Sequence, residues 1–230
     1  MSEVARAREV QGRVVLQRRM GDSLLRSGQP DEADIAYRKA LGLLDDVLRG
    51  FPESPYDLHG RLIALSPQEA AEAAELWGER GGILRRRSEW ESSLTSYTRG
   101  AAFEEVFDLP ATYNRVNALK LSLITGRTVS DLADGLAKVR RILEERLGAD
   151  ERAADDAWLW ADLGDVRLLL GDLEGAITAY RTFISKARTD SPGLTLSVLR
   201  DVIEGMERNG DPDVGILHAS AERVEKALTA

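Results

Sequence analysis

One spacing recurs three times along the 230-residue chain. A glycine is followed after 12 residues by a small residue, and after 4 more residues by a tyrosine. This spacing suits two antiparallel helices, because glycine and the small residue allow close approach. The tyrosine is expected to fill the gap between one pair and the next, with its hydroxyl at the wet edge. The three sets are Gly21, Ala33 and Tyr37; Gly81, Ser93 and Tyr97; and Gly164, Ala176 and Tyr180.

The hydrophobic pattern is helical almost throughout, and alternating runs of β-branched residues are missing, so an all-α fold is predicted. Ser66 before Pro67, with Glu69 three residues on from Ser66, has the form of a capping box. The irregular link 51–66 is expected to be a surface loop or a small lid. The pattern predicts ten helices, at 3–27, 31–49, 67–87, 89–107, 110–125, 129–147, 151–170, 172–188, 192–208 and 212–228.

The third unit resembles the tetratricopeptide repeat in Trp160, Leu163, Gly164, Gly171, Ala176 and Tyr180. Trp77 and Trp160 each stand 4 residues before a repeat glycine and are expected to pack in the core. The resemblance implies a right-handed superhelical array of antiparallel helix pairs in one domain, 1–230. Its units are expected at about 10–50, 67–107, 110–147 and 151–188, with capping helices in 192–228.

Residues 94–204 also resemble the TRAFs-binding domain of the apoptosis-signal-regulating kinase kinase kinases. The likeness rests mainly on Tyr113, Val116-Asn117, Ala118 and Leu119. The chain carries no kinase domain, so the resemblance implies a regulatory or scaffolding role. Because bacterial relatives of this array are associated with signalling and conflict-system effectors, a role in bacterial stress or defence signalling is expected.

In such an array the first helix of each pair lines a concave groove. Mixed charge and aromatic side chains there suit an extended peptide or helix of a partner protein. Alternatives stay open: the run 85–87 could grip a phosphate or be a solvated helix end, Asn117 could tie helix to loop, and Trp158 could be core or groove. The predicted groove residues are Arg18, Asp22, Arg85, Arg86, Tyr113, Asn117, Lys120, Trp158 and Asp165.

The composition limits which catalytic and binding functions can be expected of this chain. Cysteine is absent, histidine occurs only at His59 and His218, and no catalytic motif appears, so no enzyme, metal or cofactor is expected. The net charge of -8 argues against a nucleic-acid partner, and no segment is apolar enough for a membrane, which favours the cytoplasm.

The leading hypothesis is a protein-interaction module that controls or recruits a separate effector. The alternative is a sensor of a small anionic, nucleotide-like signal held by Arg85, Arg86 and Lys120. A third possibility is a structural subunit that forms homo- or hetero-oligomers through the repeat edges.

Overall fold

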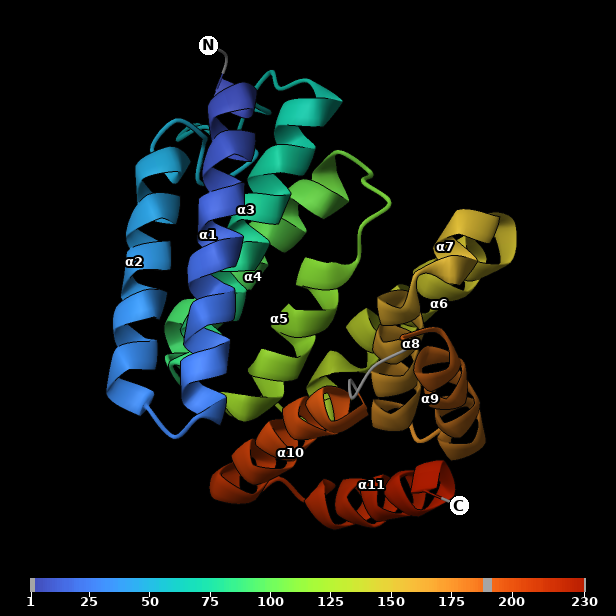
Figure 1. Ribbon diagram of the computed structural model, residues 1–230. Coiled ribbons are helices and arrows are strands. Elements are labelled where there is room, and N and C mark those ends of the chain that lie inside the picture. The colour runs from blue at the N-terminus through green and yellow to red at the C-terminus, as the bar shows by residue number, and fades with distance from the viewer. Residues whose placement is uncertain (1–2, 188–191, 230) are drawn as a thin grey trace. The chain divides into compact units, whose positions relative to one another are not determined.

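The computed structural model describes residues 3–187 and 192–229, and most of these residues are helical (Figure 1). The described residues form no β-strand, only an isolated bridge between Tyr56 and Leu62. The all-α prediction is therefore confirmed. The helices are α1 (Glu3–Arg26), α2 (Pro30–Leu48), α3 (Pro67–Arg86), α4 (Trp90–Val106), α5 (Tyr113–Ile124), α6 (Val129–Ala149), α7 (Glu151–Asp155), α8 (Ala157–Leu169), α9 (Leu173–Ala187), α10 (Pro192–Asn209) and α11 (Val214–Thr229).

One predicted helix, 151–170, is two helices. Asp156 has an extended backbone conformation, and its carboxylate accepts a hydrogen bond from the amide of Trp158. That carboxylate caps the start of α8, which separates α8 from the short α7. Elsewhere the predicted helix ends differ by a few residues from those observed, and residue 188, the predicted end of 172–188, lies outside the described residues.

The chain divides into two compact units, Met1–Ala118 and Leu119–Ala230, and α5 runs across the boundary. Each unit has its own packed helices. That both belong to one repeat domain stays a prediction.

Unit 1 contains two closely packed helix pairs, α1 with α2 and α3 with α4, and α3 also packs against both α1 and α2 (Figure 1). The repeat glycines make this packing possible. A Cβ atom on Gly21 would lie 2.5 Å from Cε1 of Tyr37, and one on Gly81 would lie 2.8 Å from Cδ2 of Tyr97. The expected close approach at the glycines is confirmed, but each ring lies against the glycine of its own pair.

Unit 2 repeats this contact in the pair α8 and α9, where a Cβ on Gly164 would lie 2.8 Å from Cε1 of Tyr180. α6 and α11 both pack against this pair. α6 packs mainly on α8, and α11 packs on α8, α9 and α10.

The predicted core role of the two tryptophans holds for Trp77 of unit 1, which is buried. Trp160 of unit 2 is half-buried, and its Nε1 donates to the carbonyl of Ala154 at 2.9 Å.

Candidate functional site

The predicted groove residues of unit 1 meet on a face shared by α1 and α3. Asp22 accepts hydrogen bonds from the hydroxyl of Tyr37 at 2.8 Å and from Nε of Arg86 at 2.7 Å. Nε of Arg18 lies 3.3 Å from a carboxylate oxygen of Glu79. These side chains are about one quarter exposed, so Arg18, Asp22 and Arg86 form a partly open network that links the two first helices.

Tyr113 extends this face at the start of α5. Its side chain is 48% exposed, and its hydroxyl lies 3.0 Å from the hydroxyl of Tyr97, with the two rings in an edge-on contact. The backbone of Gly82 leaves the space: a Cβ there would lie within 3.5 Å of both hydroxyls and of Nη1 of Arg86. We call Arg18, Asp22, Arg86 and Tyr113 the inner face of unit 1.

Two buried phenols beside the inner face, those of Tyr37 and Tyr97, hold their protons firmly. Burial and the hydrogen bond to Asp22 raise the pKa of Tyr37, and burial and the nearby Tyr113 raise the pKa of Tyr97. Both phenols therefore stay protonated at neutral pH and act as hydrogen-bond donors. Neither is activated as a nucleophile or a base, so the arrangement suits binding better than proton transfer.

A pattern that the sequence analysis missed connects the tyrosines to this network. In the first and third units the repeat glycine is followed by an aspartate, and that aspartate accepts from the tyrosine 15 residues later. The pairs are Asp22 with Tyr37 and Asp165 with Tyr180. The second unit has Gly82 at this position, and Tyr97 turns to Tyr113 instead. The recurring Gly-Asp dipeptide was the signal that could have predicted these bonds.

Arg85 and Asn117 are the remaining groove candidates of unit 1. Arg85 is partly buried in the last turn of α3, beside Arg86. Asn117 is buried, and its side-chain amide donates to the carbonyl of Tyr113 at 2.8 Å within α5. The side-chain amide of Asn117 is thus engaged within α5. This is close to the structural role that the sequence analysis left open for Asn117, and it differs from a side chain that is offered to a partner.

Asn114, which the sequence analysis did not single out, anchors α5 instead. A Cβ on Gly100 would lie 2.5 Å from Cγ of Asn114, so the amide group occupies the space that this glycine leaves. Its Nδ2 donates to the carbonyl of Ala74 at 3.0 Å and to Oε1 of Glu104 at 2.8 Å. Asn114 therefore joins the start of α5 to both α3 and α4.

The buried carboxylate of Glu104 completes this anchor by accepting from the backbone amides of Asn114 at 3.0 Å and Arg115 at 3.3 Å. Amides in the first turn of a helix have no partner within the helix, so Glu104 serves as a cap supplied from α4. Burial raises the pKa of Glu104 to about 7, although these amides and Arg115 oppose the rise. In the sequence Glu104 stands next to a second glutamate, Glu105, and nothing in this pair indicated that Glu104 would be buried.

In unit 2, Lys120 and Asp165 are buried, which corrects the expectation that they line an open groove. Nζ of Lys120 lies 2.6 Å from Oδ2 of Asp165 and 3.8 Å from Oδ1 of Asp162. The hydroxyl of Tyr180 donates to the other oxygen of Asp165 at 2.5 Å. The buried ammonium of Lys120 and the buried carboxylate of Asp165 are thus paired with each other, as buried charges must be.

Trp158 is 53% exposed at the start of α8, and its ring lies 5.4 Å from that of Phe183. Its exposure fits the groove alternative better than the core alternative.

Among the residues that the structure describes, no group of His, Asp or Glu side chains could hold a metal ion. No helix in the same part of the chain is long and apolar enough to cross a bilayer. A scan of known protein families finds none that matches the chain, and neither curated proteins nor solved structures give a significant match.

Proposed function

We propose that the chain is a cytoplasmic, non-catalytic protein-interaction module. In this proposal the helix pairs form a tetratricopeptide-like, right-handed array. A partner protein binds along the first helices of the pairs, and the module controls or recruits a separate effector in bacterial stress or defence signalling.

The observation that carries the proposal is the inner face of unit 1. Its charges are paired, Arg86 with Asp22 within the face and Arg18 with the neighbouring Glu79, while Tyr113 stays half exposed. A tyrosine ring offers a large contact area at a low cost in conformational entropy, and aromatic and arginine side chains are enriched at binding hot spots. A partly open polar and aromatic face of this kind fits a protein segment.

The same contacts weigh against the anion-sensor alternative. Arg86 is bound to Asp22, and Lys120 is bound to Asp165 in the other unit. A phosphate would have to displace a carboxylate at each of these cations. Thermal-shift measurements separate the two functions: a nucleotide that raises the melting temperature, with the rise lost in Arg85→Ala, favours the sensor.

The test of the interaction function is affinity capture from cells of the native host, quantified by mass spectrometry. The inner-face variant combines Arg18→Ala with Tyr113→Ala. The control combines Arg141→Ala with Tyr56→Ala, which removes one exposed arginine and a tyrosine of nearly equal exposure, 46%. Circular dichroism checks that both variants are folded.

A partner captured by the wild type and the control but lost from the inner-face variant is the expected result. Capture of the same proteins by all three would contradict the assignment of this face. No enrichment above background in any of them would contradict the interaction function itself.

A further inference from the structure

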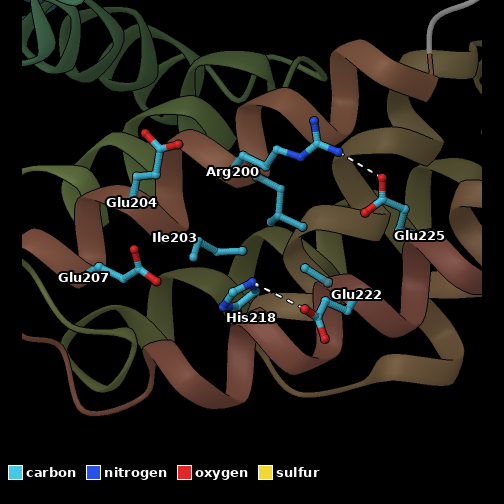
Figure 2. A pocket seen from close by; sticks show the side chains of 9 residues that line it. Arg200, Ile203, Glu204, Glu207, His218, Glu222 and Glu225 are labelled. Carbon is cyan, nitrogen blue, oxygen red and sulfur yellow. Dashed lines mark hydrogen bonds and ion pairs between the residues drawn. The ribbon is translucent and has the colours of Figure 1, made fainter.

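A cleft in unit 2 lies between α10 and α11 and has a volume of about 300 Å³ (Figure 2). Its floor is apolar: Leu199 and Ile203 are buried beneath it, and Ala221 adds a methyl group from α11. The volume is at the lower end of the range for ligand pockets, roughly 300–1,000 Å³. The cleft therefore has room for one side chain and is small for a large ligand.

The walls of the cleft are acidic. Glu204 and Glu207 lie on one side, and Glu222 and Glu225 lie on the other, with Ile203 between them (Figure 2). The other ionisable lining residues are Arg200 and His218, so the lining carries a net charge of -3 when the histidine is neutral.

The guanidinium of Arg200 already lies among these acidic side chains. Nη2 of Arg200 is 2.9 Å from a carboxylate oxygen of Glu225, and Nε2 of His218 is 3.7 Å from Glu222. Within residues 3–187 and 192–229, Glu204 and Glu207 have no cation at ion-pair distance. Because the two glutamates are three residues apart on α10, their side chains lie on the same side of the helix and share one edge of the cleft.

We infer that this cleft docks an arginine side chain from a segment of a partner protein. The apolar floor fits the methylene stem of arginine, and the free carboxylates of Glu204 and Glu207 fit its guanidinium, which forms paired hydrogen bonds with carboxylates. A metal ion is the poorer occupant, because these glutamates do not form a metal-binding group in the described chain. The cleft lies in unit 2, so this inference stands independently of the inner face of unit 1.

The probe is a synthetic peptide with two arginines separated by glycine and serine. Its control is the same peptide with citrulline, which keeps the shape of arginine and removes the charge. Binding to the full chain is followed by fluorescence anisotropy at low salt and located by NMR chemical-shift changes. The expected changes centre on the amides of Ile203, Ala221 and Glu222.

The test variant is Glu204→Gln with Glu207→Gln. The control variant, Asp134→Asn with Glu145→Gln, removes two exposed carboxylates from α6 of the same unit and changes the net charge equally. Loss of charge-assisted hydrogen bonds predicts that the test variant weakens binding about tenfold or more, while the control variant changes it less than about twofold.

Equal weakening by both variants would show general attraction to an acidic protein and overturn the proposal. Equal binding of the citrulline peptide would overturn it as well. So would an absence of binding at millimolar arginine peptide, or shift changes centred away from α10 and α11.

Discussion

Replacement of Gly21 by alanine tests whether a tyrosine ring packed on glycine holds the helix pairs together. In the middle of a helix, alanine is more favourable than glycine by about 1 kcal/mol. At Gly21, however, the added Cβ would lie 2.5–2.8 Å from three ring atoms of Tyr37, whereas ordinary contacts are 3.4–4 Å. The ring is buried and its hydroxyl is bound to Asp22, so it cannot swing away freely.

Overpacking of this kind costs about 1–3 kcal/mol. After the gain in helix propensity, Gly21→Ala is expected to lower the free energy of unfolding by up to about 2 kcal/mol. Gly12→Ala is the matched control, because Gly12 lies in the same helix, α1, and a Cβ there would meet nothing within 4 Å. That control is expected to raise the free energy of unfolding by about 0.5–1 kcal/mol.

Urea unfolding followed by circular dichroism measures both variants by linear extrapolation. A second comparison places Gly21→Ala in a Tyr37→Leu background, where the ring is gone and the alanine should cost less. The coupling between the two positions is expected to be about 1 kcal/mol or more. If Gly21→Ala proves as stable as Gly12→Ala, the packing argument for the repeat glycines is wrong.

Three further measurements follow from the buried charges and caps. Asp165→Ala removes the carboxylate that lies 2.6 Å from the buried Nζ of Lys120, so unfolding in urea should show a loss of about 3 kcal/mol, largely restored by adding Lys120→Met. Because the pKa of Glu104 is about 7 in the folded chain and near 4.5 when unfolded, the folded state holds more protons between these values. The free energy of unfolding should therefore fall by about 3 kcal/mol as pH rises from 4.5 through 7, and the difference between wild type and Glu104→Gln over this range isolates that dependence; an unchanged difference would contradict the burial argument. Ser66→Ala removes the hydroxyl of the capping box that α3 begins with and should cost about 1 kcal/mol in the same assay, whereas no loss would show that the cap contributes nothing.

The helices were predictable because their signals are local. Ser66, Pro67 and Glu69 specify the start of α3 within four residues, and the capping box forms as expected. The break at Asp156 was missed because an aspartate within a helical pattern is equally compatible with a solvated surface. Its capping role depends on the extended backbone conformation that it adopts.

The candidate site was predictable only in part. Arg18, Asp22, Arg86 and Tyr113 share a face, as groove positions of neighbouring first helices should. Lys120 does not lie on an open face, because its pairing with Asp165 brings together residues 45 positions apart.

The sequence by itself determined that this chain is helical and where its glycines allow close packing, since periodicity, caps and glycine spacing act over one or two helices. Only the tertiary structure decided which charges are buried, which carboxylate caps α5 and where a cleft opens between α10 and α11. Those features arise from the distances between helices, and charged residues such as Glu104 and Lys120 look the same in a sequence whether water or protein surrounds them.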